Sequence, residues 1–334
     1  VSMRHKLFLL ALLSVLLVSC GTDGKHFKFE GRFLHLNQGE FYLYSEDGAV
    51  SGIDTIKVEG GRFAYETACD HPATLVLVFP NFSRQPIFAE PGKTVSIKGD
   101  ASHLKEMEVT GTDDNELMTA FRKQVAEASP PEAMKLAAKF AEDHPSSRVS
   151  AYLVKSYLVA APKPDYQEAL RLTRILLEKQ ERNGDLARME QALKAITQCG
   201  VGATLPVFTA RDMKGNTVSS ASLSKGLAVI TLYASWNHDS MEQLRRLKVL
   251  RRQKGGRFQV ATFSIDASKT ECDNSLRYDS ITWPVVCDGK MFEGDVVKKL
   301  GLYSLPNNLL LKNGRVIARG LSINDLVQRI EENL

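Results

Sequence analysis

The feature that most constrains the fold is an unbroken apolar run in the last third of the chain, residues 228–235 (AVITLYAS). A run without polar alternation is typical of a strand that is buried on both faces of a sheet. After Trp236 the pattern becomes helical over residues 239–252, and a second buried strand is expected over residues 258–266 (FQVATFSID). A buried strand, a helix and another buried strand predict a parallel β-α-β unit.

The remaining C-terminal segments continue this alternation. We expect further short strands and helices over residues 271–278, 283–288, 293–300 and 322–334. Asn313 and Gly314 separate two strand-like runs, and an Asn-Gly pair favours a two-residue hairpin turn because both residues tolerate a positive φ. A β-α-β unit followed by a hairpin and a final helix predicts a thioredoxin-like α/β fold over residues 201–334.

Two other patterns precede this region. Short alternating runs separated by Gly, Pro, Asn and Asp predict an antiparallel β sandwich or barrel over residues 20–112. Gly60 and Gly61 are expected to form one of its hairpin turns. Apolar residues at three- and four-residue steps then predict four or five helices over residues 113–200, which we interpret as a helical spacer. The predicted fold class is therefore multidomain α+β.

Three segments of the last region carry a resemblance to a known family. They are residues 202–226 (GATLPVFTARDMKGNTVSSASLSKG), 228–236 (AVITLYASW) and 301–320 (GLYSLPNNLLLKNGRVIARG). They resemble the periplasmic thioredoxin-like proteins of the ResA and TlpA type, which are related to the AhpC/TSA group. The β region resembles the N-terminal domain that precedes such domains in envelope lipoproteins of the Bacteroidetes. The resemblance implies a tryptophan before the active site, here Trp236, and a cis-proline before the hairpin, here Pro306.

The pair of cysteines that defines thioredoxin chemistry is absent at the expected place. Asn237 and Ser240 occupy the two positions of the Cys-x-x-Cys motif. Disulfide exchange needs a thiolate that attacks and a second thiol that resolves the mixed disulfide, and neither an amide nor a hydroxyl can do this. Asparagine is instead a favourable N-cap residue, and Asp239 with Glu242 forms a capping pattern. We therefore predict no catalytic residue at this site.

The surroundings of the degenerate motif can still bind. The resemblance implies a shallow groove lined by Trp236, Asn237, His238, Leu305 and Pro306, which could receive an extended peptide by strand-like backbone pairing. The alternative is that the fold alone requires the proline. We interpret the histidine as an exposed loop residue, not as a general base or a metal ligand.

Two cysteines leave a redox function open. Cys272 and Cys287 flank a predicted helix in the thioredoxin-like region. They could form a structural disulfide, remain as buried thiols, or act as a relocated catalytic pair. Cys69 and Cys199 lie in other regions and are interpreted as small apolar residues. Connectivity among these cysteines does not follow from sequence alone.

The N-terminal residues indicate export. Arg4 and Lys6 precede a short apolar run that ends before Cys20, which predicts a signal peptide over residues 1–19. The sequence around the cysteine resembles the bacterial lipoprotein signal, which implies a lipid anchor at this residue. A general signal peptide is the alternative. Because neither Gly21 nor Thr22 is the aspartate that commonly retains such lipoproteins in the inner membrane, we expect an outer-membrane protein that faces the periplasm.

Composition excludes several classes of function. The net charge is only +4 and no long Lys/Arg run is present, so we expect no nucleic-acid partner. The histidines show no metal-ligand spacing, and we predict neither a metal nor a cofactor. The first hypothesis is an envelope lipoprotein that binds or scaffolds a protein or peptide. The alternatives are a divergent thiol-disulfide oxidoreductase or peroxidase that uses Cys272 and Cys287, and a small-ligand function of the β region.

Overall fold

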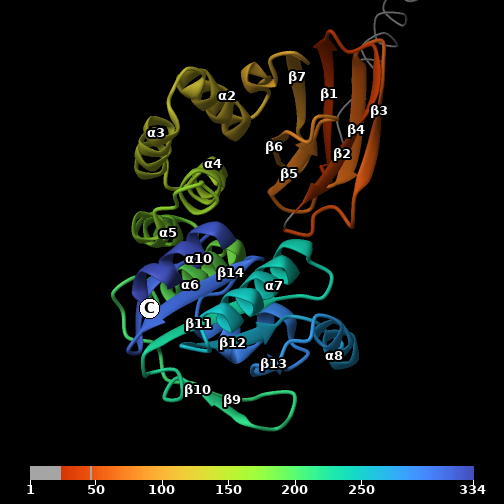
Figure 1. The fold of residues 1–334 in the computed structure, drawn as a ribbon. Helices are drawn as coiled ribbons and strands as arrows, with labels where there is room; N and C mark the ends of the chain where they lie inside the picture. Colours follow the sequence, from red (N-terminus) through yellow and green to blue (C-terminus); the bar gives the residue numbers. More distant parts are fainter. Residues whose placement is uncertain (1–23, 46) are drawn as a thin grey trace, which may run out of the picture. The chain divides into compact units, whose positions relative to one another are not determined.

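A computed structural model describes residues 24–45 and 47–334. These residues form two compact units, which are described separately (Figure 1). The first unit contains the described residues up to position 168 together with residues 172–185, and the second contains residues 169–171 and 186–334. The predicted limits of the β region, the spacer and the thioredoxin-like region stay a prediction.

One eight-stranded sheet forms the centre of the first unit. Its strands are β1 (His26–Leu34), β2 (Gln38–Ser45), β3 (Asp54–Glu59), β4 (Arg62–Ala68), β5 (Ala73–Val78), β6 (Arg84–Ala89), β7 (Thr94–Asp100) and β8 (Glu108–Thr110). They lie in the order β6-β5-β2-β3-β4-β1-β7-β8. Neighbouring strands are antiparallel except β1 and β7, which run parallel. A parallel pair needs a long crossover connection, and the five strands between β1 and β7 provide it.

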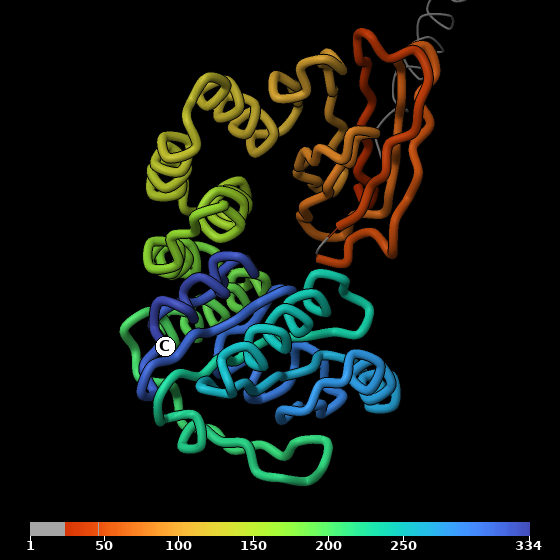
Figure 2. The backbone as a smooth tube through the Cα atoms, viewed as in Figure 1, coloured from red at the N-terminus to blue at the C-terminus, as the bar shows by residue number. Residues whose placement is uncertain are grey.

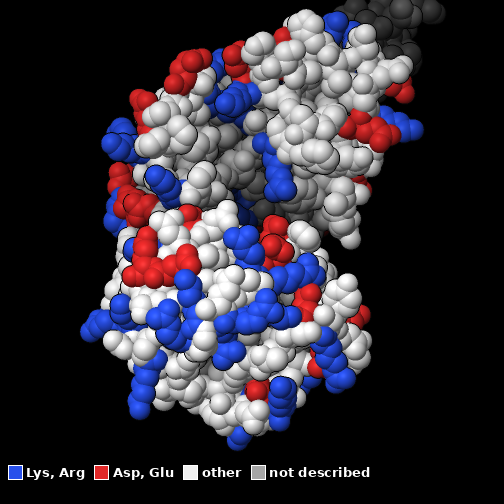
Figure 3. Space-filling view, in the orientation of Figure 1, with Lys and Arg blue, Asp and Glu red and all other residues white. Residues whose placement is uncertain are grey.

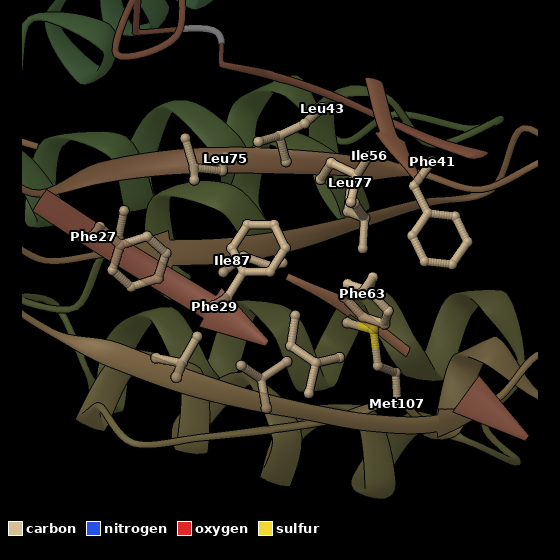
Figure 4. Packing of buried hydrophobic residues seen from close by; sticks show 14 of the residues in the cluster. Phe27, Phe29, Phe41, Leu43, Ile56, Phe63, Leu75, Leu77, Ile87 and Met107 are labelled. Atoms are coloured by element: carbon tan, nitrogen blue, oxygen red, sulfur yellow. The ribbon is translucent and has the colours of Figure 1, made fainter. Parts of the chain in front are cut away.

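Alternation along these strands builds an aromatic core on one face. In β1, Phe27 and Phe29 are fully buried whereas the residue between them is only partly covered. Figure 4 shows these rings in the same core as Phe41 and Phe63, and Phe41 meets Phe63 edge to face at 5.2 Å between ring centroids. The predicted hairpin is confirmed, since Glu59 pairs with Arg62 across the two glycines.

A helical segment follows this sheet, as the periodicity predicts. It comprises η1 (Leu104–Glu106), α2 (Asp113–Val125), α3 (Pro130–Asp143), α4 (Arg148–Leu153), the π-helical turn η2 (Val154–Val159), α5 (Tyr166–Lys179) and α6 (Gly184–Gln198). Helix α2 bonds both edge strands. Asn115 exchanges two hydrogen bonds with the Phe88 backbone of β6, and the Thr119 hydroxyl bonds the Val109 backbone of β8. Pairing of this kind protects exposed sheet edges.

The second unit contains a five-stranded sheet flanked by helices. Its strands are β11 (Leu227–Tyr233), β12 (Phe258–Ser264), β13 (Val285–Cys287), β14 (Asn307–Lys312) and β15 (Arg315–Arg319). Around them lie the hairpin β9 (Thr209–Arg211) and β10 (Thr217–Ser219), and the helices α7 (His238–Gln253), α8 (Lys269–Tyr278), η3 (Met291–Glu293), α9 (Asp295–Lys299) and α10 (Ile323–Asn333). The hairpin β9–β10 projects from the rest of this unit (Figure 2).

The strand order of this sheet is that of a thioredoxin-like fold. The order is β13-β12-β11-β14-β15, with β11 parallel to β12 and antiparallel to β14. Every residue of β11 is buried because each face of the strand meets a separate core. Val229 and Tyr233 pack with α7, α8 and α10, whereas Ile230 and Leu232 pack with α9 and the segment before β9. The predicted fold class, multidomain α+β with a thioredoxin-like C-terminal part, is confirmed.

Candidate functional site

The loop after β11 leads into helix α7 and contains Asn237 and Ser240, the predicted positions of the Cys-x-x-Cys motif. The Asn237 Oδ1 accepts a hydrogen bond from the backbone N–H of Ser240 at 2.8 Å, so the asparagine is the N-cap of α7, as predicted. The Ser240 side chain is fully buried. Its hydroxyl lies 3.2 Å from the carbonyl oxygen of Ala234 and 3.0 Å from that of Asn237. Both positions therefore stabilise the start of a helix.

The second segment of the site is the connection into β14. The Leu305-Pro306 peptide bond is cis. Leu232 of β11 pairs with Asn307 of β14, so the residues that follow β11 and those that precede β14 meet at the same end of the sheet. The Gln243 amide of α7 donates to the Asn307 carbonyl at 3.3 Å. Helix α7 therefore bonds both the loop that follows β11 and the start of β14.

We call the five predicted groove residues, Trp236, Asn237, His238, Leu305 and Pro306, the Trp236 surface. The Trp236 side chain is 61% exposed, and the histidine and the proline are also exposed. Asn237 and Leu305 are half-buried. Within the described part of the chain, the backbone N–H and C=O of Leu305 have no hydrogen-bond partner. The surface thus offers an indole ring next to an unpaired stretch of backbone.

A buried carboxylate forms hydrogen bonds with the loop that carries Trp236. Asp266 follows β12 and is 1% exposed. Its carboxylate accepts hydrogen bonds from the Ser235 backbone N–H at 2.9 Å, from the Ser235 hydroxyl at 2.8 Å and from the Ser264 hydroxyl at 2.8 Å. These bonds hold the residue that precedes Trp236. The sequence analysis missed Asp266, although an acidic residue directly after a buried strand is a signal that could have indicated it.

The two cysteines of interest lie in the same hydrophobic core, and both thiols lie next to Asp266. The Cys287 thiol donates to the backbone carbonyl of Asp266 at 3.5 Å. The Cys272 thiol lies next to the side chains of Ser264 and Asp266, and burial raises its pKa well above the usual range. Both residues are buried and free, as are Cys69 and Cys199. In this structure the pair is therefore present as buried thiols.

The remaining sequence predictions concern the N-terminal signal, the membrane and metal binding. Cys20 and residues 1–19 lie outside the described residues. No helix in residues 24–45 and 47–334 is long and apolar enough to cross a membrane. In the same residues, no group of three or more His, Cys, Asp or Glu side chains is arranged to hold a metal ion.

Comparisons with known proteins concern both parts of the chain. A family model described as a domain of unknown function, DUF4369, matches residues 27–118, which span the eight-stranded sheet and the start of α2. No curated protein matches the chain.

Several solved structures are similar to the chain. The thioredoxin domain of a thiol-disulfide oxidoreductase from Bacteroides vulgatus is 21% identical, with 40% of this chain and 96% of that one covered and a TM-score of 0.37. A thiol-disulfide oxidoreductase from Bacteroides fragilis is 24% identical, with 39% and 99% covered and a TM-score of 0.36. A thioredoxin-like protein from Bacteroides caccae is 16% identical, with 60% and 78% covered and a TM-score of 0.46. The fold assignment rests on the strand order described above.

Proposed function

We propose that the chain is a lipid-anchored protein of the bacterial envelope whose thioredoxin-like domain binds an extended segment of a protein or peptide without disulfide exchange at the degenerate motif. The lipid anchor would be at Cys20, and the Trp236 surface would be the binding site. The protein would act at the outer membrane, on its periplasmic side.

The exposed indole of Trp236 is the observation that carries this proposal. A large aromatic side chain at the surface is a common centre of protein interfaces, because it buries much area at low cost in conformational entropy. The unpaired backbone of Leu305 supplies the donor and the acceptor that strand-like pairing needs. The loop is held by the hydrogen bonds of Asp266 to Ser235, so binding would require little reorganisation.

Site-specific photo-crosslinking tests this function. A photoreactive residue at Ser304, which is exposed and adjacent to Leu305, should give adducts with an envelope protein or peptide. Trp236→Ala should lower the yield about tenfold or more, since an aromatic hot spot contributes on the order of 2 kcal/mol. Tyr278→Ala is the matched control, because Tyr278 is 86% exposed on α8. Equal yields from the two variants would contradict the proposal.

Thiol chemistry at Cys272 and Cys287 is the second candidate function. It is supported by the position of both thiols beside Asp266, below the loop that carries Trp236. Burial works against it, because the thiolate is the reactive form and a raised pKa keeps Cys272 protonated.

An activity assay separates the two candidates. We expect the full chain to show no insulin reduction with a dithiol reductant and no peroxide consumption. Turnover that is abolished by Cys272→Ser and unchanged by Cys69→Ser would establish the oxidoreductase instead, because Cys69 is a buried thiol of the other unit.

A further inference from the structure

A basic pocket lies at the other end of helix α7 from the Trp236 surface. It has a volume of about 330 Å³. Its lining includes Lys248, Arg251 and Arg252 of α7, Ser280 and Thr282 of the loop before β13, and the buried Trp283. At about 1.5 Å per residue, Arg251 lies roughly 21 Å along the helix from Asn237. The pocket is therefore separate from the site proposed above.

One polar atom of Arg251 has no partner. Its Nε is buried, and no other buried side-chain nitrogen or oxygen in the described part of the chain lacks a hydrogen bond. A buried donor that loses water and gains no acceptor costs free energy, and the cost is larger for a charged group. A guanidinium presents its N–H groups in a planar fork that fits the oxygens of a carboxylate or a phosphate. The terminal N–H groups of this guanidinium are neither buried nor hydrogen-bonded to described residues, so a bound oxyanion would pair with them.

The pocket also carries uncompensated positive charge. Two nearby cations outside it are paired: Arg245 bonds Asp279 at 2.9 Å and Lys254 bonds Glu331 at 2.8 Å. Lys248, Arg251 and Arg252 form no ion pair with any described residue. The Lys248 ammonium contacts only a backbone carbonyl, that of Asp279, at 2.8 Å. Figure 3 shows Lys and Arg gathered over the face of this unit that carries α7.

The helix dipole accounts for only part of this arrangement. Cations in the last turn of a helix are favourable next to its negative end, which explains basic residues at Arg251 and Arg252. It explains neither the pocket between this turn and the loop before β13 nor the unpartnered Nε of Arg251. The exposed hydroxyls of Ser280 and Thr282 add neutral donors on the opposite wall.

We propose that this pocket binds an oxyanion of the phosphate class, either free phosphate or the phosphate of a lipid headgroup. Arg251 would donate through its terminal N–H groups, Lys248 and Arg252 would balance the charge, and Ser280 and Thr282 would bond the remaining oxygens. A doubly charged phosphate suits three unpaired cations better than a single carboxylate does.

Titration of the full chain with inorganic phosphate at constant ionic strength tests this proposal. The NMR signal of the Arg251 Nε–H should shift with saturation. Arg251→Gln should weaken phosphate binding about tenfold or more, because a charge-assisted hydrogen bond is lost. Arg246→Gln is the matched control: it removes the same charge from an exposed position on the same helix, where Arg246 contacts only Asn324 at 3.5 Å. It should change the affinity less than twofold.

A second arm identifies the source of the phosphate. Sedimentation of the full chain with vesicles of neutral lipid, with and without phosphatidate, shows whether a headgroup is bound. Phosphatidate binding that is lost in Arg251→Gln assigns the site to a lipid, and saturable binding of inorganic phosphate alone assigns it to the free ion. The proposal is overturned if neither ligand binds, or if Arg251→Gln and Arg246→Gln reduce binding equally.

Discussion

The amide of Asn237 and the hydroxyl of Ser240 both bond the backbone around the start of α7. The first accepts from the Ser240 N–H, and the second bonds the carbonyls of Ala234 and Asn237. At the scale of single residues, the two positions predicted to correspond to the thioredoxin cysteines therefore stabilise the start of a helix. The same hydrogen bonds order the loop that presents Trp236, so stability and the proposed binding would depend on the same residues.

Removal of the cap should destabilise the second unit. Asn237→Ala should lower its free energy of unfolding by about 1 kcal/mol, and Asn237→Asp should have a much smaller effect because aspartate is also a good N-cap. Guanidinium unfolding followed by tryptophan fluorescence measures this, since both tryptophans of the chain, Trp236 and Trp283, lie in this unit. Asn274→Ala, an exposed asparagine on α8, is the control. A loss as large in the control would contradict the role of the cap.

The thiol of Cys272 predicts a pH dependence. Its folded-state pKa is raised above the ordinary value of 9.0 by burial. The unfolded chain releases this proton at lower pH than the folded chain, so the stability contributed is fully present below about pH 9 and is lost as the pH rises through the raised pKa. The denaturant concentration at the unfolding midpoint of the second unit should decrease as the pH rises above 9, and this decrease should be less steep in Cys272→Ala. Identical slopes in the two proteins would refute this assignment.

At the scale of elements, a buried amide pair joins α7 to the strand that follows Pro306. The Asn308 Nδ2 donates to the Gln243 Oε1 and to the Leu321 carbonyl, both at 2.8 Å, and the Asn308 Oδ1 accepts from the Leu321 N–H at 3.1 Å. Gln243 in turn bonds Asn307. These bonds fix the register of helix and strand where the Trp236 surface forms.

Asn308→Leu should therefore cost about 2–3 kcal/mol, because it leaves buried donors and acceptors of Gln243 and Leu321 without partners. Combined with Gln243→Leu, the total loss should be smaller than the sum of the two single losses, since the residues share one network. The wild type, the two single variants and the double variant form a double-mutant cycle, and their chemical unfolding measures the coupling between the two amides. Strict additivity would show that the amides act independently.

The elements were more predictable than this network. Strand alternation, the unbroken apolar run of β11 and the two glycine-containing turns depend on local sequence, and the structure contains them. The roles of Asp266, Asn308 and Gln243 depend on partners far along the chain. The two amides, for example, are 65 positions apart. The position of Asp266 directly after a buried strand is a local signal, but nothing local to Asn308 or Gln243 indicates its partner, so the amide network required the structure.

At the scale of the whole molecule, the proposed membrane attachment depends on Cys20. Cys20→Ser should move the protein from the membrane fraction to the soluble fraction, because acyl chains contribute about 0.8 kcal/mol per buried CH₂. Labelling with a palmitate analogue should be lost in the same variant, whereas Cys69→Ser should retain both properties. A labelled and membrane-bound Cys20→Ser protein would contradict lipidation at this residue.

The Trp236 surface is proposed to bind without thiol chemistry. The affinity of the full chain for the segment captured by crosslinking should be measured in wild type, Trp236→Ala and the double variant Cys272→Ser/Cys287→Ser. The double variant should bind within about twofold of wild type, and Trp236→Ala should bind about tenfold or more weakly because an aromatic anchor is lost. Binding that disappears with the two thiols and survives Trp236→Ala would contradict this proposal.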